Sequence, residues 1–173
     1  DERIVHAPEI GAGVHLIKVS NGPTWSFKDM ALRFLAQLLE YLLEETDRRL
    51  IIVVATSGDT GSAVIDAMRA ISRITVVVLS PKGGTMSPLQ RAQMYGVNAP
   101  NVINYAVEGS FDDCQRLAKA LLLDSDLQSR GISGANSINP IRIFAQIVYY
   151  FEACRQMKAT HDRPATIVVP SGN

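Results

Sequence analysis

Apolar residues recur along the chain in two alternating patterns. Short runs rich in β-branched residues are typical of strands covered on both faces, and they occupy 51–55, 74–79, 102–107 and 167–169, with a further candidate strand at 14–19. Between them, apolar residues recur at helical spacing over 27–45, 61–71, 87–95, 110–123 and 139–158. This alternation predicts an α/β fold with parallel strands joined by right-handed crossovers.

Two of the predicted helices begin with recognisable signals. Ser110, followed three residues later by Asp113, resembles a capping box with Asp in place of Glu. Pro140 stands in the first turn of the last helix, where proline is tolerated.

Composition narrows the classes of partner. The 173 residues carry 17 Lys and Arg against 17 Asp and Glu, without a basic stripe, so we expect no nucleic-acid partner. The longest strongly apolar stretch, 143–151, is too short to span a bilayer. Cys114 and Cys154 form no CxxC pair and indicate a reducing, cytoplasmic location. No His, Cys or Asp cluster has metal-ligand spacing.

Both ends of the sequence suggest a piece of a longer polypeptide. Residues 1–13 lack the clear start of any element, and 166–173 is a strand pattern that runs into a glycine turn. Because a strand and turn of this kind normally lead into a helix, we expect further chain beyond Asn173.

Lys28 is the first candidate for chemistry. It ends the segment 21–28, Asn-Gly-Pro-Thr-Trp-Ser-Phe-Lys, where a glycine–proline turn becomes a helix. A lysine that attacks a carbonyl must be available as the free amine, which requires burial or nearby positive charge to lower its pKa. The competing interpretation is a lysine that extends into solvent or pairs with Asp29.

A second candidate is the loop 55–62, Ala-Thr-Ser-Gly-Asp-Thr-Gly-Ser, between a predicted strand and a predicted helix. Its glycines permit close approach of a ligand, and the following helix N-terminus favours a carboxylate or phosphate. The plainer interpretation is a turn in which Asp59 or Thr60 is the N-cap. The loop lacks the spacing of dinucleotide-binding and P-loop motifs.

Two further segments carry polar groups at element ends. Asn136, Ser137 and Asn139 precede a helix whose first turn contains Arg142. Because arginine is unfavourable at this end of a helix dipole, it needs an anionic partner, either a bound phosphate or a neighbouring carboxylate. The last segment, Pro-Ser-Gly-Asn at 170–173, follows a strand, as ligand-binding turns of open α/β sheets do.

Taken in order, these segments resemble threonine synthase among the fold-type II pyridoxal-phosphate enzymes. The resemblance runs from about residue 14 to the end of the chain, and its matching segments are 21–29, 55–63, 87–94 (Ser-Pro-Leu-Gln-Arg-Ala-Gln-Met), 111–115, 136–139, 145–151 and 169–173. It departs from the family at Asn21, where many members have His, at Trp25, where Leu is common, and at Pro140, where Trp is frequent.

The resemblance implies a carbon–oxygen lyase of threonine biosynthesis that converts O-phospho-L-homoserine and water into L-threonine and phosphate. Lys28 would hold pyridoxal 5'-phosphate as a Schiff base and move substrate protons. The cofactor would also contact Asp59 through its ring hydroxyl, and Ser171, Gly172 and Asn173 through its phosphate. The substrate carboxylate would bind Ser57 and Thr60, and its phosphate would bind Asn136, Ser137 and Arg142.

The resemblance also implies a two-lobed architecture that is present only in part. Residues 1–48 and 136–173 would belong to the larger lobe, truncated at the phosphate loop, and 49–135 would form the smaller lobe. The site would then be incomplete, so we expect this chain alone to be inactive. Two alternatives stay open: another fold-type II enzyme such as a serine/threonine dehydratase or cysteine synthase, and an inactive fragment that acts as a binding protein.

Overall fold

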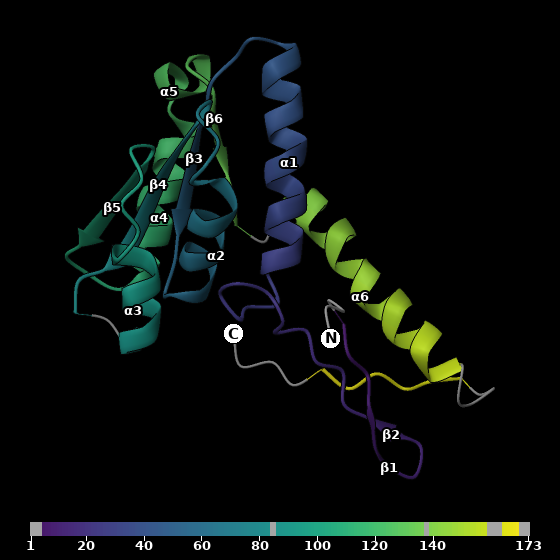
Figure 1. The fold of residues 1–173 in the computed structure, drawn as a ribbon. Helices are drawn as coiled ribbons and strands as arrows, with labels where there is room; N and C mark the ends of the chain where they lie inside the picture. The colour runs from purple at the N-terminus through teal and green to yellow at the C-terminus, as the bar shows by residue number, and fades with distance from the viewer. Residues whose placement is uncertain (1–4, 84–85, 137–138, 159–163, 170–173) are drawn as a thin grey trace.

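A computed structural model describes residues 5–83, 86–136, 139–158 and 164–169. Strands and helices alternate through most of this length (Figure 1). The strands are β1 (Glu9–Gly11), β2 (Val14–His15), β3 (Leu50–Ala55), β4 (Ile74–Pro81), β5 (Val102–Val107) and β6 (Ile132–Gly134). The helices are α1 (Asp29–Glu45), α2 (Asp59–Met68), α3 (Pro88–Tyr95), α4 (Phe111–Leu123), α5 (Ser125–Ser129) and α6 (Pro140–Lys158).

The main sheet has four parallel strands in the order β5-β4-β3-β6. The chain builds the sheet outward from β3 through β4 to β5, and then returns by way of α4 and α5 to place β6 on the other side of β3. The strand order therefore reverses between β3 and β6, and ligands of open α/β sheets bind at such a reversal, beyond the carboxyl ends of the strands.

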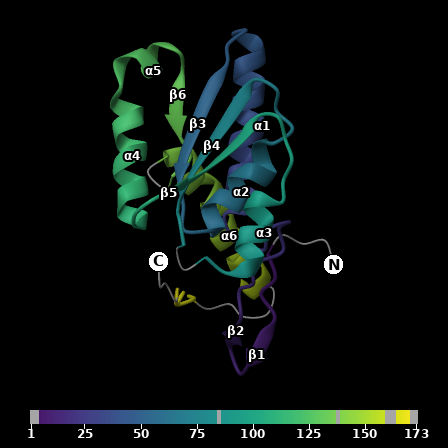
Figure 2. The ribbon, with the colours of Figure 1, turned by 90° about the vertical axis from the view of Figure 1, so that its left-hand side faces the viewer.

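Helices cover both faces of this sheet, which explains why its central strands are mostly apolar. Ile52 and Val54 of β3 share one buried cluster with residues of α1, α2 and α3, whereas Val53 and Ala55 pack against Cys114 and Ala118 of α4. Figure 2 shows α4 on one side of the sheet, and α1 and α2 on the other. The two-residue alternation of a strand sends successive side chains into different cores.

α6 extends away from the sheet and packs against α1 (Figure 1). A third, smaller cluster joins its Tyr149 and Ala153 to Val5 and Ala7 near the N-terminus. β1 and β2 form a separate antiparallel pair. Among the described residues, no helix is sufficiently long and apolar to cross a membrane.

Most of the predicted elements are confirmed, including the capping box at Ser110, whose side chain and that of Asp113 bond each other's backbone N–H groups. The predicted strand at 167–169 is wrong. Residues 164–169 form no strand, and Val168 is 82 % exposed. An apolar run becomes a strand only where a neighbouring strand satisfies its backbone groups, and no such neighbour lies beside it in the described part of the chain.

Candidate active site

The candidate site forms where the strand order reverses. The loops that follow β3 and β6 leave the same edge of the sheet because the two strands are parallel neighbours. The side-chain amide of Asn136, after β6, donates to the carbonyl oxygen of Ala55, the last residue of β3, at 3.1 Å. This bond joins two loops that are about eighty residues apart in sequence.

The loop after β3 is held in shape by its own threonine. The hydroxyl oxygen of Thr56, which is buried, accepts the backbone N–H groups of Gly58 and Gly61 at 2.9 Å each. Gly58 is the N-cap of α2 and has φ of 147°, which only glycine adopts readily. The N-cap predicted at Asp59 or Thr60 is therefore wrong, because both residues lie in the first turn of α2.

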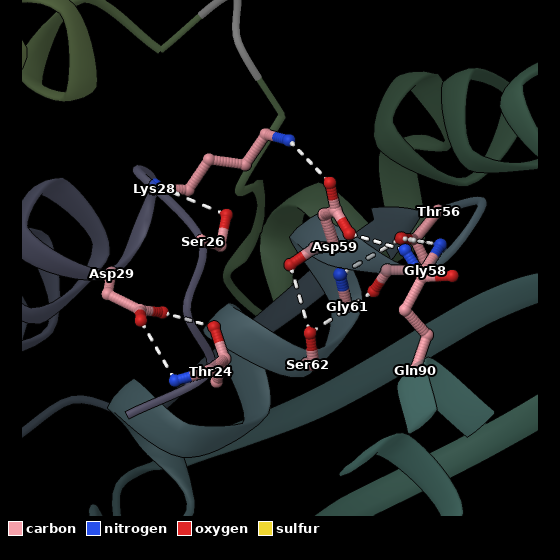
Figure 3. A network of polar contacts seen from close by, with 10 residues as sticks. All are labelled: Thr24, Ser26, Lys28, Asp29, Thr56, Gly58, Asp59, Gly61, Ser62 and Gln90. Carbon is pink, nitrogen blue, oxygen red and sulfur yellow. Dashed lines mark hydrogen bonds and ion pairs between the residues drawn. The ribbon is translucent and has the colours of Figure 1, made fainter. Parts of the chain in front are cut away.

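Lys28 lies at the start of α1 with its side chain almost fully buried. The residue is 6 % exposed, and its amine lies 4.8 Å from the ring centre of Phe27 and 3.8 Å from Oδ2 of Asp59 (Figure 3). Burial lowers the pKa of Lys28 most strongly; the Asp59 carboxylate opposes this shift, and the positive charge of Arg142 adds to it. The result is an amine that loses its proton more readily than an ordinary lysine.

The interpretation of Lys28 as a solvent-exposed partner of Asp29 is contradicted by this geometry. Asp29 is itself buried, and its two carboxylate oxygens accept the hydroxyl and the backbone N–H of Thr24 at 2.5 and 2.9 Å. The carboxylate thus ties the turn before the helix to the first helical residue. Gly22 is required here because a Cβ at that position would lie 2.2 Å from Oδ2 of Asp29.

Two further contacts fix the backbone around Lys28. The hydroxyl of Tyr149, on α6, donates to the carbonyl oxygen of Phe27. The backbone N–H of Lys28 donates to the hydroxyl oxygen of Ser26 at 3.2 Å. Tyr149 was not singled out as a site residue from the sequence, because its contact with Phe27, in the turn before Lys28, joins positions that are 122 residues apart.

Arg142 is buried in the first turn of α6 and is 2 % exposed. Its Nη1 donates to the carbonyl oxygen of Ala135 at 2.7 Å, while its buried Nε has no hydrogen-bond partner in the described structure. No ion pair joins Arg142 to a carboxylate among the described residues, so the alternative of a salt bridge to a carboxylate has no support there. A buried guanidinium in this state is suited to an anion that enters from outside.

Asp59 is held by a residue that was not singled out from the sequence. Its side chain is 53 % exposed, and its Oδ1 accepts the side-chain amide of Gln90, on α3, at 2.5 Å (Figure 3). The available signal was the position of Gln90, three residues after the N-cap Ser87, where a capping-box residue normally lies.

The structure thus places most of the predicted site residues around one edge of the sheet. Ser57, which is exposed, lies in the loop after β3, and Thr60, which is half-buried, follows Asp59 in the first turn of α2. Asn136 bonds the end of β3, and Arg142 lies near enough to Lys28 to influence its pKa. Ser137, Ser171, Gly172 and Asn173 lie outside the described residues.

Comparisons with known proteins agree with this arrangement. The family model of the pyridoxal-phosphate dependent enzymes matches residues 4–173. Threonine synthase of Corynebacterium glutamicum is 42 % identical over 173 residues, which cover 99 % of this chain and 36 % of that enzyme. Threonine synthase of Methylobacillus glycogenes is 44 % identical over 161 residues, which cover 92 % of this chain and 34 % of that enzyme.

A solved structure shows the same fold. The crystal structure of pyridoxal-phosphate-bound threonine synthase from Brucella melitensis superposes with a TM-score of 0.83 at 39 % identity, covering 92 % of this chain and 34 % of that one. The chain spans about a third of the length of the curated relatives it matches. By sequence and by fold, the chain belongs to the pyridoxal-phosphate dependent enzymes and, among them, to the threonine synthase family.

Proposed function

We propose that this chain is the central part of a threonine synthase, which converts O-phospho-L-homoserine and water into L-threonine and inorganic phosphate. The observation that carries the proposal is the buried amine of Lys28, which faces the glycine loop after β3 at the reversal of strand order. A buried lysine with a lowered pKa, beside a loop suited to anions, is the arrangement expected of a lysine that reacts with a carbonyl.

The residues present are compatible with pyridoxal 5'-phosphate. Lys28 would hold its aldehyde carbon, Asp59 would face its ring hydroxyl, and Ser171, Gly172 and Asn173 would bind its phosphate. The amine of Lys28 is 3.8 Å from Oδ2 of Asp59, beyond hydrogen-bond distance, so this carboxylate leaves it available to a covalent partner. When bound, the cofactor supplies an electron sink for carbanions next to it.

The substrate would be held at its two anionic ends by different loops. Ser57 in the loop after β3 and Thr60 in the first turn of α2 would bind the carboxylate with the help of the N-terminus of that helix. Asn136, Ser137 and Arg142 would bind the phosphate. The buried Nε of Arg142, which lacks a partner in the described structure, is a donor that such a phosphate oxygen would satisfy.

Lys28 would also take up and return substrate protons. Its buried position excludes water from the amine, and its lowered pKa makes the free base accessible at lower pH than for an exposed lysine. The charges of Asp59 and Arg142 shift this balance in opposite directions. The lysine is thereby poised to exchange a proton in either direction.

The proposal predicts that Lys28 is the lysine that holds the cofactor. In the whole protein of which this chain is proposed to be a part, Lys28→Ala should abolish phosphate release from phosphohomoserine. Borohydride reduction of the unaltered protein, followed by peptide mapping, should place the cofactor on Lys28. Lys18 and Lys82 are the internal controls, and label on either of them instead would refute the assignment.

The same preparation separates the two alternative functions. An enzyme that deaminates serine or threonine without releasing phosphate from phosphohomoserine would be a dehydratase rather than a threonine synthase. A protein that stays colourless with added pyridoxal phosphate and takes up no label would be a binding protein of the same fold.

A further inference from the structure

Gln90 has a defined orientation because its two amide atoms have different partners. Its Oε1 accepts the backbone N–H of Ser87 at 2.9 Å, as the second half of a capping box at the start of α3. A carbonyl oxygen accepts and an amide nitrogen donates, so this bond fixes which end of the amide faces outward. The end that faces Asp59 is the donor, Nε2.

The carboxylate of Asp59 lies between Gln90 and Lys28. Its Oδ1 accepts from Nε2 of Gln90 at 2.5 Å, and its Oδ2 lies 3.8 Å from the amine of Lys28 (Figure 3). Because the side chain of Asp59 is 53 % exposed, packing alone does not restrict its rotation. The hydrogen bond to Gln90 restrains Oδ1, the carboxylate oxygen on the far side from Lys28.

The backbone of the loop lies directly against Gln90. A Cβ on Gly58 would come within 2.7 Å of Cδ of Gln90, so the absence of a side chain at Gly58 allows the contact. The side-chain amide of Gln93, which lies on α3 as Gln90 does, donates to the carbonyl oxygen of Thr24 in the turn before Lys28 at 3.3 Å. α3 therefore contacts both loops that meet at Lys28.

We infer that Gln90 is a positioning residue, which holds the carboxylate of Asp59 in the orientation that presents its second oxygen to the amine of Lys28. The inference deepens the proposed function and rests on it, because it assigns to α3 the control of the charge beside the reactive lysine. The charged groups that influence Lys28 are Asp59 from α2 and Arg142 from α6, with the uncharged ring of Phe27 beside them.

The test measures the protonation midpoint of Lys28 by NMR of its ¹³C-labelled Cε in the protein without cofactor. The resonance is identified by its loss in Lys28→Arg. In Gln90→Met, which keeps the length of the side chain but lacks the amide, the carboxylate of Asp59 turns towards solvent and the lysine loses a stabilising charge. The midpoint should fall by about half a pH unit or more, which gives about threefold more free amine at neutral pH. Gln90→Asn, which is one methylene shorter, should give the same direction of change and serves if Gln90→Met does not fold.

Three companion variants decide the interpretation. Ser87→Ala breaks the same capping box without touching Asp59, and should leave the midpoint unchanged. Asp59→Asn should lower the midpoint, and adding Gln90→Met to it should lower it no further, because the two residues act through one carboxylate. The inference is overturned if Gln90→Met titrates like the unaltered protein, if Ser87→Ala shifts as far, or if the double variant shifts further than Asp59→Asn.

The outcome is separable from that of the proposed function. The midpoint is read without cofactor or substrate, so an unchanged midpoint in Gln90→Met removes the role of Gln90 and leaves the proposed reaction intact. Phosphate release by the unaltered whole protein tests the reaction independently of Gln90.

Discussion

At the scale of single residues, the site contains two buried cations, Lys28 and Arg142. No carboxylate in the described structure forms an ion pair with Arg142. Lys28 has Asp59 at 3.8 Å, whereas the guanidinium of Arg142 donates to the carbonyl oxygen of Ala135. Burial lowers the pKa of both groups. Keeping a buried guanidinium charged costs free energy, and an entering phosphate would offset that cost with charge-assisted hydrogen bonds.

The first prediction at this scale concerns Arg142→Lys. Lysine keeps the positive charge but loses the planar, two-pronged geometry of the guanidinium. In the whole protein, affinity for phosphohomoserine should fall by roughly the value of one charge-assisted hydrogen bond, about 1.5–3 kcal/mol. Affinity for the cofactor should change much less. Binding of each is measured by titration of the protein's absorbance.

The matched control is Arg155→Lys on the same helix. Arg155 is exposed in the last turn of α6 and pairs with Glu152, so its replacement should leave both affinities unchanged. A fall in cofactor affinity without a fall in substrate affinity would show that Arg142 binds the other phosphate.

At the scale of elements, α6 contacts the turn that immediately precedes Lys28 and holds it in place. Tyr149 donates its hydroxyl proton to the carbonyl oxygen of Phe27, immediately before Lys28. Burial, together with the charge of Asp29, raises the pKa of Tyr149 to about 12. A helix from late in the sequence thus holds the turn in which the reactive lysine lies, so the geometry of the turn depends on the packing of α1 against α6.

Tyr149→Phe should therefore destabilise the protein. The variant leaves the carbonyl oxygen of Phe27 without its donor, at a cost of about 1–3 kcal/mol in the free energy of unfolding. The pH dependence has a definite sign. Between pH 10 and about 12 the unfolded tyrosine ionises while the folded one stays protonated, so this residue lowers stability as pH rises through that window. Tyr149→Phe lacks this contribution.

The measurement is denaturant unfolding at neutral pH and across the alkaline window. Tyr150→Phe, at the neighbouring and more exposed position on α6, is the control and should change little at neutral pH. Equal losses in the two variants would mean that the bond to Phe27 contributes nothing specific.

Local signals in the sequence were sufficient to predict most of the helices and strands. The buried strands β3 and β4, the helix that begins beside Lys28 and the capping box at Ser110 depend on neighbouring residues, and the structure confirms them. The cap of α2 was mispredicted because the hydroxyl of Thr56, which lies two residues before the N-cap, takes the role expected of Asp59. β6, only three residues long, has too few positions to show a pattern.

Contacts between distant segments could not be predicted in the same way. The bond between Gln90 and Asp59 and the bond between Tyr149 and Phe27 depend on how helices pack, which no local pattern encodes. Residues 167–169 illustrate the converse: the local apolar pattern is that of a strand, yet the strand requires a hydrogen-bonding neighbour elsewhere in the molecule.

At the scale of the whole molecule, the structure leaves apolar side chains of α6 exposed. Phe144 and Phe151 are 68 % and 73 % exposed, and Ile143 and Val148 are about half exposed. The chain covers about a third of the length of its curated relatives. We propose that residues 1–48 and 136–173 belong to a larger lobe and 49–135 to a smaller one. The apolar face of α1 nevertheless shares one buried cluster with β3 and α2, so the proposed boundary at residue 48 crosses a continuous core.

The last prediction is that the 173-residue chain by itself has little or no threonine synthase activity. The proposed cofactor phosphate site begins at Ser171, Gly172 and Asn173, and further backbone N–H groups would be needed to complete such an anion site. A cofactor held only by Lys28 would lack its second anchor, and a misplacement of about 1 Å can cost about a hundredfold in rate. Phosphate release from phosphohomoserine is measured for the 173-residue chain beside the whole protein, with circular dichroism to confirm that the sheet has formed. If the folded chain works within about tenfold of the whole protein, a difference of only about 1.4 kcal/mol in the barrier, then no further backbone N–H groups are needed, and the proposal of a phosphate site that begins at 171–173 and is incomplete in this chain is wrong.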